Sequence, residues 1–354
     1  MMQNKWIRRT ALTAVLVLPV LVAGCGIWNK GSKEIDPPQV ELEDQQEDGA
    51  KSTLGAVDVE NMEGAENITV YLQDRNGYLA PVSLPAVLGA EEEAGQRVLE
   101  MMVDNGTYAN VLPEDFRAMI PQGTQVLEYE HNPETHIVKV DFSESFADYN
   151  SQDERAIVES ITWALTSLPD VQGVEIYHEG ERLAEMPASG MPLDQVLTRE
   201  MGINLELANG VNYTNSYPVM LYFSSMTYYD EQYYVPVTRL INRSDSTVHA
   251  AMEELIAGPL NKKELISVIM PGVEVLSIEE KDGVVTIDLE DSTYASDKPA
   301  PSEMLEAVVL SLTENTDAQA VQIKLNGQTD VVDDRNQIYS KPVNKPLHVN
   351  KIKS

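Results

Sequence analysis

The order of apolar and polar residues predicts amphipathic helices and short strands from about residue 68 to residue 334. The clearest helix has apolar side chains three and four positions apart, and it is followed by Gly258 and Pro259, residues that end helices. Two β-branched runs then flank Asp282 and Gly283, a pair typical of a tight hairpin turn. The apolar positions of the helix are Val248, Ala251, Met252, Leu255 and Ile256. We therefore expect a helix followed by a β-hairpin.

A second set of the same elements precedes this one, because the chain repeats itself. Residues 140–176 align without a gap with residues 287–323, and nine of the 37 positions are identical at an offset of 147. The helix in the earlier segment begins with Ser151 and Glu154 at the spacing of a capping box. Each copy has the order strand, strand, helix, strand, strand, helix, strand. The sequence therefore predicts an α+β fold, built as two tandem copies of a small sheet with two helices on one face.

The segments around the copies differ in composition, and they set the expected domain boundaries. We expect each copy to fold separately, because each has a complete set of elements. The basic tail is interpreted either as a solvated terminus or as a segment that docks onto an acidic partner or a membrane. The expected boundaries are residues 1–24 for a signal peptide, 25–67 for an acidic flexible tether, 68–187 for the first domain, 188–217 for a linker, 218–334 for the second domain and 335–354 for the basic tail.

The first 25 residues have the pattern of a secretory signal. Lys5, Arg8 and Arg9 precede an apolar run, which ends in small residues before Cys25, the only cysteine of the chain. The run is short for a bilayer span, which takes about 20 residues. An uncleaved anchor helix is the alternative. Either interpretation places the rest of the chain outside the cytoplasm.

Charge and cysteine content exclude several classes of function. The chain has 57 acidic residues against 25 Lys and Arg, which gives a formal net charge of −32 at pH 7. Nucleic-acid binding relies on clustered basic residues that release counterions, so we expect no nucleic-acid partner. A single cysteine forms neither an intramolecular disulfide nor a zinc ribbon.

Few residues carry a catalytic or metal-binding pattern. His131 and His136 flank the expected hairpin turn of the first copy, where a weak metal site is the alternative to a solvated turn. Asp141 and Asp288 occupy equivalent positions in the two copies, so turn capping is favoured over paired catalytic carboxylates. Nucleotide-binding and hydrolase motifs do not occur in the sequence. We therefore expect no enzymatic activity, no cofactor and no metal.

Tyrosines gather at the start of the second copy. Aromatic side chains of this kind anchor protein interfaces, and in a hairpin alternate positions also face the core. Stacking on carbohydrate is a third use. Tyr228, Tyr229, Tyr233 and Tyr234 are therefore candidate interface residues, with the core of an edge hairpin as the alternative.

Several motifs of the second copy resemble the GerMN family of sporulation and germination domains. They are Val-Pro-Val-Thr at 235–238, Gly-Pro at 258–259, Met-Pro-Gly at 270–272 and Thr-Ile-Asp-Leu at 286–289. The resemblance extends over residues 68–332, and it implies a fold similar to the ring-building motif of secretion systems. The segment before Cys25 resembles a bacterial lipoprotein signal. That likeness implies cleavage before Cys25 and a thioether-linked lipid with palmitate on this residue.

The resemblance to the family implies a non-enzymatic lipoprotein needed for sporulation and germination. Its implied partners are membrane proteins of the channel between mother cell and forespore. Its implied location is the extracytoplasmic side of the cell membrane, which in sporulating cells is the outer forespore membrane facing the intermembrane space. A peptidoglycan-binding, cortex-binding or remodelling factor is the alternative, because such domains also occur beside cell-wall amidases. A solute-binding lipoprotein is a third hypothesis, but short sheets leave little room for a cleft.

Overall fold

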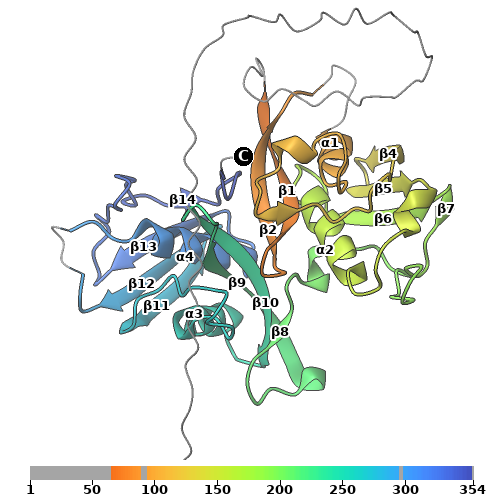
Figure 1. Ribbon diagram of the computed structural model, residues 1–354. Coiled ribbons are helices and arrows are strands. Elements are labelled where there is room, and N and C mark those ends of the chain that lie inside the picture. Colours follow the sequence, from red (N-terminus) through yellow and green to blue (C-terminus); the bar gives the residue numbers. More distant parts are fainter. Residues whose placement is uncertain (1–64, 89–93, 295–297, 353–354) are drawn as a thin grey trace, which may run out of the picture. The chain divides into compact units, whose positions relative to one another are not determined.

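The computed structural model describes residues 65–88, 94–294 and 298–352 (Figure 1). The expected signal peptide, Cys25 and nearly all of the expected tether lie outside the described residues. Within the described ranges, no helix combines the length and the apolar character that crossing a membrane requires.

The first copy consists of two sheets with two helices packed between them (Figure 1). Its elements are β1 (Glu66–Asp74), β2 (Leu79–Ala86), α1 (Ala94–Met101), η2 (Ala109–Val111), β3 (Phe116–Arg117), β4 (Val126–Asn132), β5 (Ile137–Phe142), η3 (Glu144–Ala147), α2 (Glu154–Leu165), β6 (Gly173–His178) and β7 (Glu181–Arg182). Strand β1 lies between β2 and β3 in one sheet, and the other sheet has the order β4-β5-β6-β7. Helix α1 contacts β1 and β4, while α2 contacts β1 and β6.

The second copy repeats this arrangement, and a connecting segment with short elements precedes it. The elements are η4 (Arg199–Met201), β8 (Glu206–Leu207), η5 (Tyr213–Asn215), β9 (Ser216–Met226), β10 (Gln232–Asn242), α3 (Thr247–Ala257), β11 (Val273–Lys281), β12 (Val284–Asp291), α4 (Ser302–Glu314), β13 (Ala320–Leu325) and β14 (Val343–Asn344). The sheets have the orders β8-β10-β9 and β11-β12-β13-β14. Helices α3 and α4 both contact β9, and they also contact β11 and β13 respectively.

The register of the strands confirms the α+β class and the tandem copies. Strand β5 pairs in parallel with β6, with Ile137 opposite Gly173. Strand β12 pairs in parallel with β13, with Val284 opposite Ala320, so both partners are shifted by 147 residues. The predicted hairpin turn is also confirmed, because Asp282 and Gly283 separate β11 from β12.

Local signals explain where helix α3 begins and ends. The hydroxyl of Ser246 accepts the backbone N–H of His249 at the start of α3, and Gly258 ends this helix with a φ of 84°. The expected capping box in the first copy is wrong. Helix α2 begins at Glu154, whose buried carboxylate instead accepts the backbone N–H groups of Ala188 and Ser189 at 3.0 Å each. This carboxylate therefore fixes the start of the connecting segment.

Buried apolar side chains of both copies form one continuous core cluster. It includes Val70 and Trp163 of the first copy, Tyr222 and Leu312 of the second, and Ile352 near the end of the described chain. The expectation that each copy folds separately is based only on the complete set of helices and strands predicted for each copy. The shared cluster argues against it, because separating the copies would expose apolar surface to water.

Candidate functional site between the two copies

The segment that follows the first copy crosses to the second copy. We define residues 197–207 as the first arm. It begins on its own copy, where Leu197 forms a β-bridge with Val174. It then reaches the second copy, where the backbone N–H of Thr238 donates to the Ile203 carbonyl at 2.9 Å and β8 pairs in parallel with β10. The first arm thus covers the free edge of β10.

The segment that follows the second copy makes the reverse crossing. We define residues 343–352 as the second arm. It begins as β14 on β13 of its own copy and then reaches β2 of the first copy. There the backbone N–H of Ser83 donates to the Asn350 carbonyl at 3.1 Å, and the Ser83 hydroxyl donates to the Val349 carbonyl at 2.8 Å. This corrects the interpretation of the basic tail as a solvated terminus, because the second arm pairs with a strand edge of this chain.

An asparagine on the first arm joins the two copies. The Asn204 carboxamide oxygen accepts the backbone N–H of Leu79 at 2.8 Å. Its amide nitrogen donates to the carbonyls of Leu79 and Pro236, both at 2.7 Å. Leu79 lies on β2 and Pro236 on β10. One side chain therefore satisfies backbone groups from both copies, which would otherwise be buried without partners.

An asparagine on the second arm makes the same contacts with the copies exchanged. The Asn350 oxygen accepts the backbone N–H of Tyr234 at 2.7 Å, and its nitrogen donates to the carbonyls of Tyr234 at 2.7 Å and Pro81 at 2.8 Å. Asn204 and Asn350 both have a positive φ, 49° and 57°. In the repeat, Tyr234 is the counterpart of Leu79. The two copies and their arms are therefore related by an approximate two-fold exchange.

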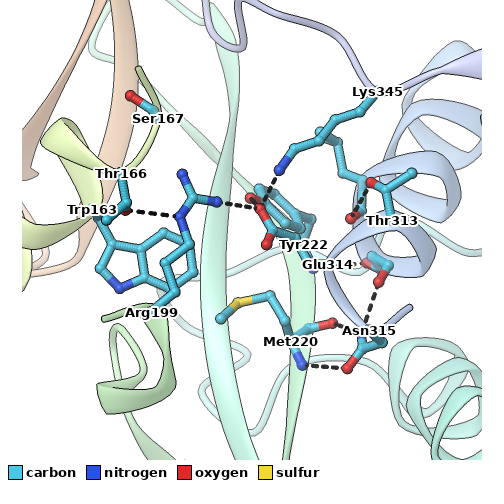
Figure 2. A network of polar contacts seen from close by, with 12 residues as sticks. Trp163, Thr166, Ser167, Arg199, Met220, Tyr222, Thr313, Glu314, Asn315 and Lys345 are labelled. Atoms are coloured by element: carbon cyan, nitrogen blue, oxygen red, sulfur yellow. Dashed lines mark hydrogen bonds and ion pairs between the residues drawn. The ribbon is translucent and has the colours of Figure 1, made fainter. Parts of the chain in front are cut away.

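A cluster of charges lies beside this exchange (Figure 2). The Arg199 guanidinium of the first arm is 2.8 Å from the Glu314 carboxylate at the end of α4, and Lys345 of the second arm pairs with the same carboxylate oxygen. Arg199 also donates to the Thr166 hydroxyl at 3.0 Å and lies 4.5 Å from the centre of the Trp163 ring. The cluster therefore connects α2, α4 and both arms.

The charges of this cluster control each other's protonation. Burial favours the neutral form of the Glu314 carboxyl, but the charges of Arg199 and Lys345 outweigh it and hold the pKa below its ordinary value. Burial lowers the pKa of the Lys345 ammonium, and the attraction of Glu314 offsets this only in part. The Tyr222 hydroxyl also donates to Glu314 at 3.3 Å. The cluster binds two arms to one carboxylate and is arranged for holding rather than for proton transfer.

A second ion-pair cluster fixes the first arm on the second copy. Arg239 on β10 is fully buried, and its Nε lies 2.6 Å from the carboxylate of Glu206 on the first arm. Its other nitrogens contact the Glu254 carboxylate at 2.8 Å and donate to the Gly258 carbonyl at 3.0 Å. Each of the three guanidinium nitrogens thus has a hydrogen-bond acceptor, as a buried charge requires.

Two of the four candidate tyrosines are exposed at the turn between β9 and β10. Tyr228 and Tyr229 are 75% and 73% exposed. The Arg75 guanidinium lies 4.4 Å from the centre of the Tyr228 ring, and the Tyr229 hydroxyl donates to the Glu114 carboxylate at 3.1 Å. Arg75 and Glu114 belong to the first copy. The turn therefore lies against the first copy while both rings keep most of their surface in solvent.

The other two candidate tyrosines lie in the core. Tyr233 is 1% exposed, its hydroxyl donates to Asp74 at 2.8 Å and its ring lies edge-on against Phe116, with 5.1 Å between centroids. Tyr234 is 8% exposed, and its hydroxyl donates to Glu306 of α4 at 2.7 Å. These contacts leave Tyr233 and Tyr234 little surface for a partner. The interface hypothesis is thereby narrowed to Tyr228 and Tyr229.

The two equivalent aspartates have structural roles. The Asp141 carboxylate accepts the backbone N–H of Gly180 at 3.1 Å, and Asp288 accepts that of Gly327 at 2.9 Å. Each glycine lies in the turn after the closing strand, so these residues do cap turns, but not the turns directly after their own strands. A positive φ of 82° and 77° explains glycine at these two positions.

The two candidate histidines meet at one backbone oxygen. His131 Nε2 and His136 Nδ1 each lie 3.1 Å from the Asp170 carbonyl oxygen, to which a protonated ring nitrogen donates. Among the described residues, no group of three or more His, Cys, Asp or Glu side chains is arranged to hold a metal ion. The hydrogen bonds connect the hairpin turn to the segment after α2.

Both arms belong to the repeat, although no motif of the sequence marks them. The repeat continues beyond residue 323 at an offset of 146. It pairs Leu197 with Val343, Arg199 with Lys345, Met201 with Leu347, Ile203 with Val349 and Asn204 with Asn350. This longer alignment is the sequence signal that identifies the expected linker and basic tail as parts of the repeated unit.

Comparisons with known proteins agree with the duplicated fold. The family described as Germane, sporulation and spore germination, matches residues 69–184 and again residues 220–331. The chain is 34% identical to the spore germination protein GerM of Bacillus subtilis (strain 168) over 360 residues, which covers 96% of each chain. The solved structure of the tandem GerMN domains of the sporulation protein GerM from Bacillus subtilis is similar with a TM-score of 0.74 and 34% identity, covering 81% of this chain and 99% of that one. The chain therefore belongs to the sporulation and spore germination family.

Proposed function

We propose that this protein is a non-enzymatic, membrane-anchored lipoprotein that assembles with the channel complex between mother cell and forespore. The observation that carries the proposal is the likeness to GerM along almost the whole chain, with both domains aligned. The tandem copies share a core cluster, and each arm pairs with a strand of the other copy. This arrangement suits a structural component, because a folded surface that changes little on binding can serve as a docking surface for partners.

The use of the acidic residues supports a role without catalysis. Asp141 and Asp288 each accept a glycine N–H in a turn, and Glu314 is paired with two cations. These carboxylates are engaged in holding the fold. A general acid or base instead needs a group that exchanges protons with a substrate.

The anchor of the proposed lipoprotein is Cys25. It follows a short apolar run, and a lipid on this residue would hold the folded part on the extracytoplasmic side of the membrane. In sporulating cells this side of the outer forespore membrane faces the space in which the channel assembles. Mass spectrometry of the membrane-extracted chain checks the lipid, since an unmodified thiol at Cys25 would contradict the anchor.

Complementation tests the proposed function. The chain, expressed in Bacillus subtilis lacking GerM, is expected to restore spore formation, whereas Cys25→Ala is expected to restore much less because the protein leaves the membrane. Channel proteins should co-purify with the intact lipoprotein from sporulating cells, and less so at high salt. Full rescue by Cys25→Ala, or hydrolysis of cortex peptidoglycan by the purified protein, would contradict the proposal.

A pocket of about 450 Å³ in the first copy favours peptidoglycan contact as a second candidate function. Uncharged polar side chains predominate in its lining, and Thr124 Oγ1 is buried there without a hydrogen-bond partner among the described residues. Hydroxyl and amide side chains match the hydroxyl and acetamido groups of glycan strands. These residues are Asn105, Thr107, Gln122, Thr124 and Gln125. Co-sedimentation of the purified chain with cell-wall sacculi checks this candidate, with Thr124→Val as the variant.

A further inference from the structure

A second pocket, of about 340 Å³, lies where the turn between β9 and β10 meets the first copy. Three carboxylates line it, Glu114, Asp115 and Glu231, and no lysine or arginine is among its described lining residues. The other lining residues are Pro113, Thr227, Tyr229 and Ile352. The pocket therefore combines negative charge with apolar surface.

Asp115 has an oxygen without a partner in this pocket. Its side chain is largely covered, since the residue is only 9% exposed. Asp115 Oδ2 accepts the backbone N–H of Tyr228, whereas Oδ1 is buried and has no hydrogen-bond partner among the described residues. A buried carboxylate oxygen without a donor is costly, because it has lost its hydration. The pocket thus presents an acceptor that a ligand can satisfy.

The chemistry of the walls narrows the class of ligand. The carboxylates favour a cation, but no group of three or more His, Cys, Asp or Glu among the described side chains is arranged to hold a metal ion. A basic side chain fits better, because its charged end donates to carboxylates while its methylene groups contact apolar and aromatic surface. The Tyr229 ring is 73% exposed, so it offers a face for such contact.

We propose that this pocket binds a lysine or arginine side chain from a basic segment of a partner protein. The net charge of −32 attracts such a segment over a distance, and the Asp115 carboxylate gives it a specific place to bind. Tyr228 beside the pocket is 75% exposed, and it would be covered by the backbone of the bound segment. This proposal rests on the proposed function in one respect, the identity of the partner protein that supplies the basic segment.

Peptide binding to the purified full chain tests the proposal. The probe is a fluorescently labelled Gly-Ser peptide with lysines at its centre, and its control is the same peptide with acetylated lysines. We expect the first peptide to bind and the second not to bind in fluorescence anisotropy. Asp115→Asn keeps an acceptor for the Tyr228 N–H but removes the charge, so it should weaken binding about tenfold or more.

Matched variants separate the pocket from the general charge of the chain. Glu280→Gln removes one exposed acid on β11, and it should weaken binding less than about twofold. Equal weakening by Asp115→Asn and Glu280→Gln, with unchanged unfolding temperatures, would overturn the proposal in favour of non-specific attraction. Tyr229→Ala should also weaken binding, because the wall for the methylene groups is lost.

A shortened chain distinguishes the partner from the chain's own lysine. Lys353 follows Ile352 in the sequence and is a competing source of a basic side chain. A chain ending at Ile352 should bind the peptide as the full chain does. Binding by the shortened chain alone would overturn the proposal. Complementation in cells reports on the role in sporulation, so rescue of spore formation by a chain that binds no peptide would overturn this inference and leave the proposed function intact.

Discussion

The two asparagines of the arms are used alike, whereas the two cations of the arms are not. Asn204 and Asn350 each bind a strand of the first copy and a strand of the second copy, through three equivalent hydrogen bonds. Arg199 and Lys345 are also counterparts, yet both pair with Glu314 of the second copy. The equivalent position in the first copy is Ser167, whose hydroxyl donates to the Ala164 carbonyl.

The difference shows which contacts the duplication preserves. Asparagine side chains bind backbone groups, which both copies present in the same way because they share a fold. The ion pairs depend on side chains at single positions, so the difference between Glu314 and its counterpart Ser167 is enough to place the charge cluster on the second copy alone. Arg199 therefore crosses to the other copy, whereas Lys345 binds its own.

Removing the second arm should have the largest effect. A chain ending before Val343 loses β14, the Lys345 pair and the Asn350 contacts, and it leaves the edge of β2 unpaired. We expect the free energy of unfolding to fall by about 4 kcal/mol or more, as for other losses of a buried polar network. Urea unfolding measures this. Removal of Lys353 and Ser354 alone is the control, and a wild-type midpoint without the arm would contradict the exchange.

Neutralising the shared carboxylate comes next. Glu314→Gln leaves two partly buried cations without a counter-charge, so we expect the free energy of unfolding to fall by about 3 kcal/mol. This value is at the lower end for a broken buried ion pair, because 26% of the Arg199 side chain is exposed. Glu274→Gln on β11 removes an exposed acid and should change stability by less than about 0.5 kcal/mol. Equal effects of the two variants would show that the cluster adds no more than surface charge.

Replacing either asparagine should cost about the same. Asn204→Gly and Asn350→Gly retain the positive φ and remove the hydrogen bonds, so each should lower the free energy of unfolding by about 2 kcal/mol. Alanine at either position should cost about 1 kcal/mol more, because its φ becomes strained. Thermal unfolding of both pairs measures the effects, with Asn242→Ala at the exposed end of β10 as control. Clearly unequal losses would contradict the approximate two-fold exchange.

Low pH should remove the contribution of the Glu314 carboxylate to the stability of the fold. The pKa of Glu314 is lower in the folded chain than its ordinary value of 4.5, so this carboxyl stabilises the fold above pH 4.5 and loses that contribution as the pH falls through the folded pKa. The difference in stability between the wild type and Glu314→Gln should therefore shrink in this range. A constant difference from neutral pH to strongly acidic pH would contradict the lowered pKa.

The repeated elements could be predicted because their signals are local. The Asp282-Gly283 turn and the end of α3 at Gly258 each depend on one or two residues and their own backbone angles. The α+β class followed from the order of such elements. Asp141 and Asp288 were correctly interpreted as residues that cap turns, but the turns they cap lie 39 residues further on, which no local pattern contains.

The contact between the copies could not be predicted from periodicity. Tyr233 and Tyr234 are neighbours on β10, and alternation places only one of two neighbours in a core. Both are buried because the first copy packs against one and helix α4 contacts the other. The arms were missed for a related reason, since Asn204 and Asn350 are polar residues whose partners are backbone groups far away in sequence.

The exchange of arms also sets an order of events when the chain is made. Synthesis proceeds from the N-terminus, so strand β2 emerges from the ribosome long before Asn350, which covers its edge. During that interval the first copy has an unpaired strand edge, which is prone to pairing with other chains. The corresponding edge of the second copy has its partner as soon as β10 is made, because the first arm precedes β10 in the chain. A truncated chain that lacks the second arm would keep the edge of β2 unpaired, and proteases that degrade incompletely folded proteins would recognise it.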